Sequence, residues 1–197
     1  MKTIGKLTLI ALFFLGFTAH SYAQAFTVNT GQSKVNWNGK KVTGEHYGTI
    51  NLKGGTLQVS NGQVTGGNFE MDMNSIVCED LTDPGTNAKL VGHLKSDDFF
   101  SVAKFPGATM AITQVKKTSG NDYVYTGNLT IKGITHPITF TATTTVEGST
   151  LKASGKMVVD RAKYDIRFRS GSFFQNLGDN LIYDDFTLDF SLVANAQ

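Results

Sequence analysis

Apolar and polar residues alternate along several segments of this chain, as in a β-strand with one buried face. In Phe186–Leu192 the even-numbered residues are apolar and the odd-numbered residues are polar. Ile138–Val146 follows the same pattern, with threonine at every odd-numbered position. Shorter stretches around Trp37, Phe69 and Leu129 alternate in the same way. Since each strand has one dry and one wet face, the pattern favours an antiparallel sheet.

Turn signals separate the alternating segments. They are Asn38-Gly39, Gly54-Gly55, Asn61-Gly62, Gly66-Gly67, Ser119–Asp122 and Glu147-Gly148. This spacing gives about eight strands at hairpin distances, which predicts an all-β fold, either a barrel or a sandwich.

One segment, Asp83–Lys95, breaks the period of two. It begins with turn residues, Thr86 is a candidate helix cap, and Leu90 and Leu94 stand one helical turn apart. We therefore expect a short helix in an inter-strand insertion, lying across a sheet edge or a barrel mouth.

The first 23 residues are predicted to be a secretory signal peptide. Two lysines precede a short apolar run, Leu7–Phe17, and small residues mark a cleavage site after Ala23 or, alternatively, after Ala25. The apolar run is too short to span a bilayer, which takes about 20 residues. We expect residues 24–197 to form one periplasmic or secreted domain, because no linker or internal repeat divides them.

The charge balance argues against a nucleic-acid partner. The 197-residue chain has a formal net charge of +2, but the predicted signal peptide carries two lysines and no acidic residue. The remaining chain is formally neutral, whereas electrostatic binding to nucleic acid needs a positive stripe.

Few residues offer chemistry. The chain has no Gly-x-Ser-x-Gly motif and no phosphate-binding loop, so we predict no catalytic residues and no enzymatic activity. His46, His93 and His136 are isolated in sequence, and we expect no metal site, although distant strands could still assemble one. Cys78 is the only cysteine, which excludes an internal disulfide and predicts a small buried thiol.

All three arginines lie within nine residues, at Arg161, Arg167 and Arg169. The favoured interpretation is a strand whose charged face is exposed to solvent. The alternative is a cluster at a barrel mouth that binds an anionic head group, because the guanidinium fork matches phosphate oxygens. In the following loop, the adjacent aromatics Phe173 and Phe174 need burial at the core edge or against a ligand.

Three motifs follow one another along the chain. The first is Gly92–Pro106, the second is Gly127–Pro137, and the third is Asp160-Arg161 followed by the aromatic Tyr164. In order and spacing they resemble the YceI-like family of exported lipid-binding proteins. One position departs from the pattern, since many family members carry glycine where this chain has Asp165.

The resemblance implies an extended eight-stranded antiparallel barrel, lipocalin-like in shape, whose apolar lumen holds a polyisoprenoid chain. A quinone or a prenyl pyrophosphate would be bound for transport, storage or scavenging, with no other cofactor required. An eight-stranded barrel is just wide enough for one slender ligand. The residues expected to line the lumen are Trp37, Phe69, Met71, Met73, Leu90, Leu94, Phe99, Phe100, Leu129, Ile131, Ile138, Phe140, Phe174, Phe186, Leu188 and Phe190.

Other functions remain open. The barrel could be filled by its own side chains and act as a structural or protein-interaction module. The sequence pattern does not distinguish this from a ligand-binding barrel, because a packed core and a lined pocket both give alternating apolar and polar residues. A membrane-spanning outer-membrane barrel is disfavoured by the polar outer faces and the helical insertion. No group of residues in the sequence supports an enzyme that acts on an isoprenoid head group. The oligomeric state is also open, a homodimer included.

Overall fold

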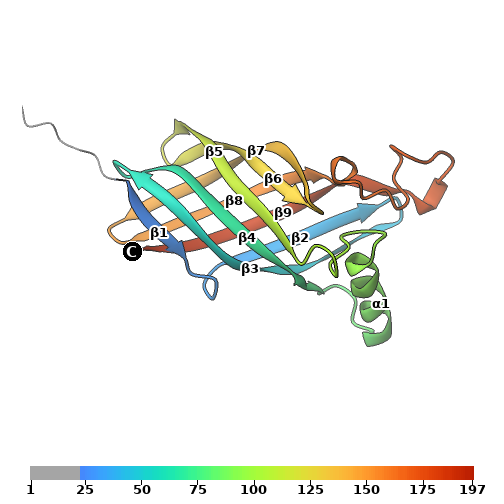
Figure 1. The fold of residues 1–197 in the computed structure, drawn as a ribbon. Helices are drawn as coiled ribbons and strands as arrows, with labels where there is room; N and C mark the ends of the chain where they lie inside the picture. The colour runs from blue at the N-terminus through green and yellow to red at the C-terminus, as the bar shows by residue number, and fades with distance from the viewer. Residues whose placement is uncertain (1–22) are drawn as a thin grey trace, which may run out of the picture.

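The computed structural model describes residues 23–197, so the predicted signal peptide lies outside the described residues except for Ala23. In this part of the chain, nine β-strands form one antiparallel sheet (Figure 1). The strands are β1 (Gln24–Val28), β2 (Lys34–Lys41), β3 (Gly44–Ser60), β4 (Gln63–Cys78), β5 (Gly107–Ser119), β6 (Asp122–Ile131), β7 (Ile134–Glu147), β8 (Thr150–Asp160) and β9 (Ile182–Ala196).

The sheet closes into a barrel with eight wall positions, because β1 and β2 share one of them. Both strands pair with β3 on one side and with β9 on the other, and the loop of residues 29–33 separates them. The pairing of β3 with β4 completes the ring. This confirms the predicted eight-stranded antiparallel barrel.

The predicted alternation places apolar side chains inside the wall. Phe186, Leu188, Phe190 and Leu192 of β9 all contribute to the core or pack against it. Thr144 also lies on the buried face, although it is polar, and its hydroxyl is 2.7 Å from the hydroxyl of Tyr125. A buried hydroxyl needs such a partner, because leaving it unpaired costs about 1–3 kcal/mol.

Three of the predicted turns are wrong, because the glycine pairs lie inside strands. Asn38-Gly39 belongs to β2, Gly54-Gly55 to β3 and Gly66-Gly67 to β4. At Gly67 a Cβ would stand 2.7 Å from the backbone oxygen of Thr56. Glycine here permits the close approach of β3 and β4 rather than a reversal of the chain.

A β-bulge in β3 explains why its pattern was hard to read from sequence. The pairing of β3 with β4 shifts between Leu52 and Gly54. Ile50 and Leu52 are buried before the bulge, whereas Leu57 and Val59 are buried after it. An extra residue in one strand moves the inward face from even to odd positions.

The expected helix is α1 (Pro84–Lys95), between β4 and β5. Its N-cap is Asp83 rather than Thr86, because the Asp83 carboxylate accepts hydrogen bonds from the backbone N–H and the hydroxyl of Thr86, at 2.8 and 2.6 Å. No helix within residues 23–197 is long and apolar enough to cross a membrane.

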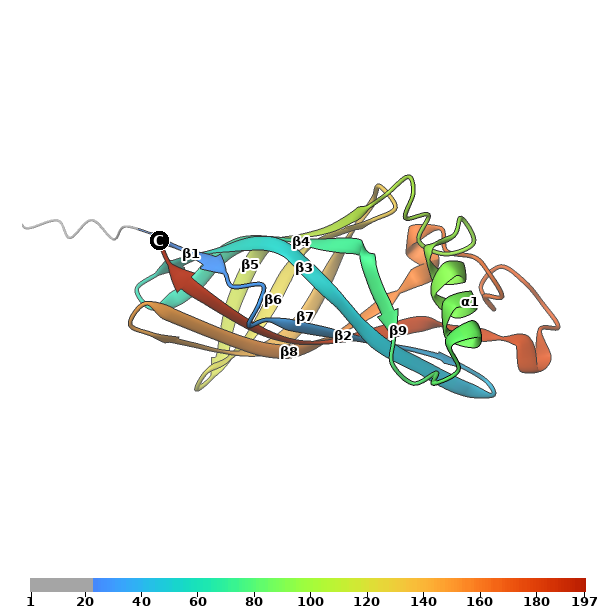
Figure 2. The ribbon, with the colours of Figure 1, turned by 90° about the horizontal axis from the view of Figure 1, so that it is seen from below.

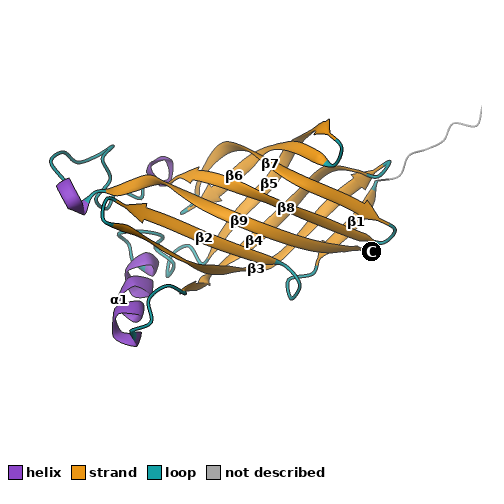
Figure 3. Ribbon diagram, turned by 180° about the vertical axis from the view of Figure 1, so that it is seen from behind, coloured by secondary structure: helices purple, strands orange, loops and turns teal. Residues whose placement is uncertain are grey.

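The two ends of the barrel are built differently. The C-terminus and β1 lie at one end (Figure 2). Phe26 of β1 is fully buried, as are Ala194, which pairs with Val28 of β1, and Leu151, which pairs with Ala194. At the opposite end lie α1 and the chain between β8 and β9, which includes the short helices η1 (Arg161–Tyr164) and η2 (Gly178–Asn180) (Figure 3). The fold thus has a packed end at the termini and an end covered by a helix and loops.

Adjacent glycines in β4 allow a matched test of the close approach. We expect Gly67→Ala to lower the free energy of unfolding by about 1–3 kcal/mol, since the added methyl group overpacks the wall. Gly66→Ala is the control, because its Cβ would lie 3.9 Å from the nearest atom outside its immediate neighbours. Urea unfolding measures both variants, and equal stabilities would contradict the explanation.

Candidate functional site

The barrel encloses two apolar cavities, one of about 180 Å³ and one of about 100 Å³. The larger, here the outer cavity, lies at the α1 end, and the smaller inner cavity lies toward the termini. Met71, Leu129 and Leu188 line both cavities. These three side chains lie where the two cavities adjoin, and we call them the waist.

All but two of the sixteen expected lumen residues line one of these cavities. Those on the outer cavity are Trp37, Met71, Met73, Leu90, Leu94, Phe99, Phe100, Leu129, Ile131, Phe186 and Leu188. Phe69, Phe140 and Phe190 line the inner cavity. The side chains of five strands (β2, β4, β6, β7 and β9), the helix and the segment after it therefore line the interior of the barrel.

The two remaining residues lie elsewhere. Ile138 packs against the core but lines neither cavity. Phe174 is 50% exposed, because it lies in a tight turn whose backbone N–H groups at Phe173 and Phe174 both donate to the carbonyl of Ser170. The Phe173-Phe174 pair is thus solvent-exposed, and the expectation that these rings are buried at the core edge was wrong, whereas their burial against a ligand stays a prediction.

The sequence interpretation missed part of the lining. Its further apolar residues are Val35, Ile50, Leu52, Leu57, Val64, Ile76, Ala108, Met110, Ile112, Tyr125, Ala142, Leu151, Ala153, Met157, Ile182 and Leu192. Alternation in β5 and β8 could have identified several of them, since Ala108, Met110 and Ile112 are two residues apart. The bulge in β3 hid the others on that strand.

The outer cavity reaches the molecular surface beside α1. Its lining includes the exposed side chains of Lys40, Lys41 and Tyr183, at the ends of β2 and β9. We call this opening the mouth. The opening therefore carries two lysines, of which Lys40 forms an ion pair with Glu45 at 3.5 Å, whereas most of the remaining cavity wall is apolar.

The segment that contains the arginines is not a strand. It forms η1 and then turns, with left-handed backbone at Asp165 and Arg169, whose φ angles are 57° and 49°. The favoured interpretation of the sequence was therefore wrong. The two left-handed residues interrupt any continuous extended run.

Arg161 is buried, with 4% of its surface exposed, although it also lines the outer cavity. Its guanidinium donates to the carbonyls of Ile166, Ile182 and Tyr183 at 2.8, 3.0 and 3.1 Å. An Asp184 carboxylate oxygen lies 3.3 Å from Nη2 in an ion pair. Burial lowers the pKa of Arg161, and the neighbouring Asp184 carboxylate opposes that shift. These contacts hold the chain between β8 and β9 against the barrel.

Arg167 and Arg169 are exposed and line neither cavity. Arg167 pairs with Asp165 and lies over the Phe173 ring, with 4.8 Å from its Cζ to the ring centroid. Arg169 lies over the ring of Phe168 at 5.2 Å. The three arginines have separate partners and do not form one cluster at the mouth.

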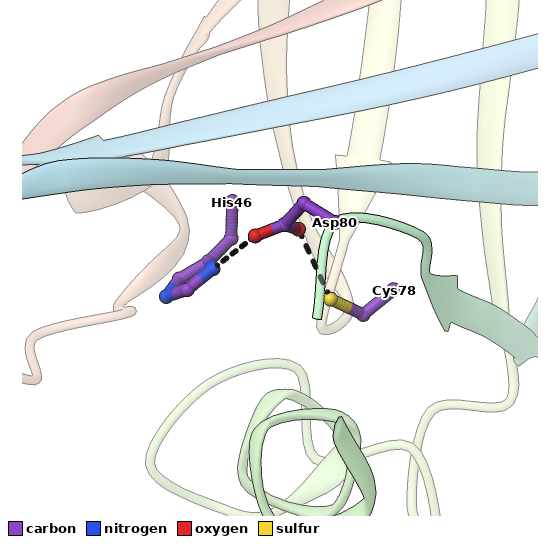
Figure 4. Close-up of side chains that lie close together, drawn as sticks. All are labelled: His46, Cys78 and Asp80. Carbon is purple, nitrogen blue, oxygen red and sulfur yellow. Dashed lines mark hydrogen bonds and ion pairs between the residues drawn. The ribbon is translucent and has the colours of Figure 1, made fainter. Parts of the chain in front are cut away.

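A polar cluster lies beside the outer cavity, which His46 also lines (Figure 4). The His46 Nδ1 is 2.7 Å from the Asp80 Oδ2, and the Cys78 Sγ is 3.2 Å from the Asp80 Oδ1. Burial raises the pKa of the Asp80 carboxyl, but hydrogen bonds from the Tyr47 N–H, His46 and Cys78 outweigh this and lower it to about 2. Burial is also the main cause that raises the pKa of the Cys78 thiol.

The sequence interpretation did not bring these three residues together. Cys78 is the last residue of β4 and Asp80 lies two residues further on, in the loop before α1, whereas His46 comes from the start of β3. The pairing of Gly48 in β3 with Cys78 in β4 brings the start of β3 next to the end of β4, and His46 thereby lies close to Cys78 and Asp80. A register between long strands is not visible as a short motif.

Comparison with known families matches the model of the YceI-like domain to residues 26–194. The chain belongs to the YceI-like family. The family assignment inferred from the three sequence motifs is therefore confirmed.

Curated relatives of this YceI-like protein match over shorter stretches. A UPF0312 protein of Enterobacter sp. (strain 638) is 42% identical over 86 residues, which is 44% of each chain. A UPF0312 protein of Shewanella denitrificans is 33% identical over 101 residues, which is 51% of this chain and 50% of the relative. The chain thus spans about half or less of the curated relatives it matches.

Solved structures share the fold more completely. BcnA of Burkholderia cenocepacia has a TM-score of 0.68 at 23% identity, covering 85% of this chain and 99% of that one. A polyisoprenoid-binding domain from Saccharophagus degradans has a TM-score of 0.61 at 18% identity, covering 88% and 99%. A Campylobacter jejuni YceI mutant with a monobromobimane guest has a TM-score of 0.54 at 17% identity, covering 98% and 99%. At these identities the likeness shows the fold.

The partners of Arg161 predict a structural role for it. We expect Arg161→Gln to lower the free energy of unfolding by about 3–5 kcal/mol, because it leaves Asp184 as an uncompensated, partly buried charge. Arg167→Gln, on an exposed ion pair, should change it by less than about 1 kcal/mol. Thermal and urea unfolding measure both variants. An Arg161→Gln protein as stable as the unmodified chain would contradict this role.

Proposed function

We propose that this YceI-like protein binds one long-chain isoprenoid lipid in the barrel lumen. The observation that carries the proposal is the pair of apolar cavities that meet at Met71, Leu129 and Leu188. A barrel filled by its own side chains would not leave such spaces, since protein interiors normally have few voids larger than a water molecule. The named polyisoprenoid binding of the Saccharophagus degradans domain supports the same class of ligand.

The lining suits a branched hydrocarbon. Methionines such as Met71 and Met73 are flexible and adapt to irregular shapes, while the rings of Phe140 and Phe190 present flat apolar surfaces. For ligands of this size each buried non-hydrogen atom contributes up to about 0.3 kcal/mol to the free energy of binding. Affinity therefore depends on how many carbon atoms enter the lumen.

The asymmetry of the barrel sets the orientation of the ligand in this proposal. The tail extends past the waist toward the packed end, and the head group stays at the mouth beside Lys40 and Lys41. A quinone or a prenyl pyrophosphate fits this arrangement. The protein performs no chemistry on the lipid and needs no other cofactor.

The cellular role that we propose is transport, storage or scavenging of the lipid outside the cytoplasm. It rests on the predicted signal peptide of residues 1–23, which directs the chain to the periplasm or the medium. A lipid with a long tail is nearly insoluble in water, so a protein that shelters the tail is needed wherever the lipid leaves a membrane.

The direct test is mass spectrometry of the protein purified from its native host without detergent. We expect a stoichiometric isoprenoid lipid, and the stripped protein should take up a radiolabelled prenyl lipid saturably. A protein that carries no lipid and shows no saturable uptake would contradict the proposal and favour the structural or protein-interaction module.

The waist allows a sharper prediction. Leu188→Trp should fill the passage between the cavities and weaken binding of a long prenyl alcohol at least about tenfold, since losing about five buried carbons costs about 1.5 kcal/mol. Binding of a short prenyl alcohol, which the outer cavity accommodates, should change little. Thr187→Trp is the control, because Thr187 is the neighbouring residue on the outer face of β9 and lines neither cavity. Equal losses for both alcohols would contradict the two-cavity binding mode.

The mouth predicts a weak preference for anionic head groups. Lys41→Gln should reduce the preference for prenyl pyrophosphate over prenyl alcohol by up to about fivefold, because an exposed charge pair contributes at most about 1 kcal/mol. Arg167→Ala should leave the preference unchanged, since Arg167 lines neither cavity. Paired titrations with the two lipids measure the effect. A loss of preference in Arg167→Ala alone would instead support the arginine head-group site.

A further inference from the structure

We propose that His46, Cys78 and Asp80 form a three-ligand binding site for a divalent zinc ion beside the outer cavity. Within residues 23–197 this is the group of histidine, cysteine and carboxylate side chains whose ligand atoms all lie within 4.8 Å of one another. The inference goes beyond lipid binding and does not depend on it.

The spacing of the ligand atoms is close to that of a zinc site. Zinc binds sulfur at about 2.3 Å and nitrogen or oxygen at about 2.0–2.2 Å, so neighbouring ligands of a tetrahedral site stand about 3.3–3.8 Å apart. The Cys78 Sγ is 3.2 Å from the Asp80 Oδ1, the His46 Nδ1 is 2.7 Å from the other Asp80 oxygen, and the ligand atoms of the three side chains lie within 4.8 Å of one another. Side-chain shifts of about 1 Å would place three ligands on a tetrahedron and leave the fourth position to water.

The ligand types select the class of metal. Thiolate, imidazole and carboxylate together suit zinc, whereas magnesium and calcium prefer sites made only of oxygen. A thiolate and a carboxylate also balance the two positive charges of the ion. This matters because the site adjoins an apolar cavity, where an uncompensated charge is costly.

The backbone around the site holds the ligands in place before any ion binds. Gly48 faces Cys78, and a Cβ on Gly48 would lie 1.9 Å from the Val77 oxygen, so the two strands could not approach this closely with another residue there. The Val77 oxygen accepts a hydrogen bond from the Trp37 indole at 3.0 Å. The Asn87 amide donates to the carbonyls of Cys78 and Leu81, each at 2.9 Å, and thereby fixes the loop that carries Asp80. Ligands on a pre-ordered loop lose little freedom when they bind.

Zinc would replace the protons that now connect the three side chains. The Cys78 thiol donates to Asp80. The His46 Nδ1 lies 2.7 Å from the same carboxylate and carries the proton in this arrangement, because an ionised carboxylate only accepts hydrogen bonds. On binding, the thiol proton leaves to water, the imidazole proton moves to Nε2, and the sulfur, the Nδ1 and a carboxylate oxygen each donate an electron pair to the ion. One proton is released for each ion, and no oxidant or reductant is needed.

A second histidine–carboxylate pair provides a comparison within the same molecule. The His93 Nε2 lies 3.0 Å from the Asp98 Oδ2. Within the described part of the chain it has no third ligand at the required distance. It should bind zinc much more weakly than the site that includes Cys78.

The test is a titration of the untagged, reduced protein with cobalt, which substitutes for zinc and is coloured. Cys78 is the only cysteine of the chain, so a thiolate-to-cobalt charge-transfer band can arise only at this site. We expect the band to saturate at one cobalt per chain and to disappear when zinc is added. Zinc should also raise the Tm, because an ion that binds only the folded state stabilises it.

Three variants separate a metal site from a hydrogen-bonded cluster. Cys78→Ser and His46→Gln should each weaken zinc binding at least about 100-fold, since even outer-shell substitutions cost 10–100-fold. Cys78→Ser should also abolish the charge-transfer band. His93→Gln should bind zinc as the unmodified chain does. Circular dichroism of each metal-free variant verifies its fold, and Cys78→Ser, which replaces sulfur by oxygen, is the mildest change.

Two results would overturn the proposal. One is the absence of a charge-transfer band from folded, reduced protein at saturating cobalt. The other is zinc binding that survives in Cys78→Ser but is lost in His93→Gln. Neither result would bear on lipid binding, which is measured separately by lipid uptake.

Discussion

Closure of the sheet is the constraint on which the rest of the molecule depends. Because β3 pairs with both β2 and β4, the ring has no unpaired edge, and each wall strand finds backbone partners on both sides. The wall therefore does not require a completely filled interior to satisfy its backbone. The packing of Phe26, Leu151 and Ala194 closes one end, and the lumen between that end and α1 keeps its cavities.

The polar groups of Tyr125, Thr144 and Arg161, which lie inside this wall, have defined partners. The hydroxyls of Tyr125 and Thr144 pair with each other. Arg161 donates to one carbonyl in the loop after η1 and to two carbonyls at the start of β9. In an apolar lumen an unpaired polar group would be costly, so pairing keeps the surface facing a ligand apolar. The lining can then accept hydrocarbon without specific polar contacts, which agrees with the absence of a recognisable polar motif in the sequence.

The fold and most of the lumen could be predicted from the sequence, because strand alternation is a local signal. Phe186, Leu188 and Phe190 face inward as their period of two indicates. The bulge after Leu52 could not be predicted, since one extra residue changes the inward face without changing composition. Gly66-Gly67 was wrongly predicted to be a turn for a related reason. The glycines allow another strand to approach closely, and this approach depends on the tertiary structure rather than on the local sequence.

The errors at the candidate sites have the same origin. Arg161 was expected on a wet strand face, but its partners lie up to 22 residues away, at the start of β9. The His46, Cys78 and Asp80 cluster depends on the register between β3 and β4, and sequence spacing does not reveal that register. Local periodicity therefore predicts which side chains are inside, whereas long-range pairing decides which polar groups meet.

The position of the chain ends has a practical consequence. The backbone N–H of Gln197 donates to the carbonyl of Ala25 at 3.0 Å, so the C-terminus lies against β1, at the end of the barrel opposite α1 (Figure 1). A fluorescent protein or a surface tether fused to the C-terminus would project from the packed end. An immobilised barrel would then present its opening to the surrounding solution, and biosensor measurements of uptake could proceed without steric obstruction by the support.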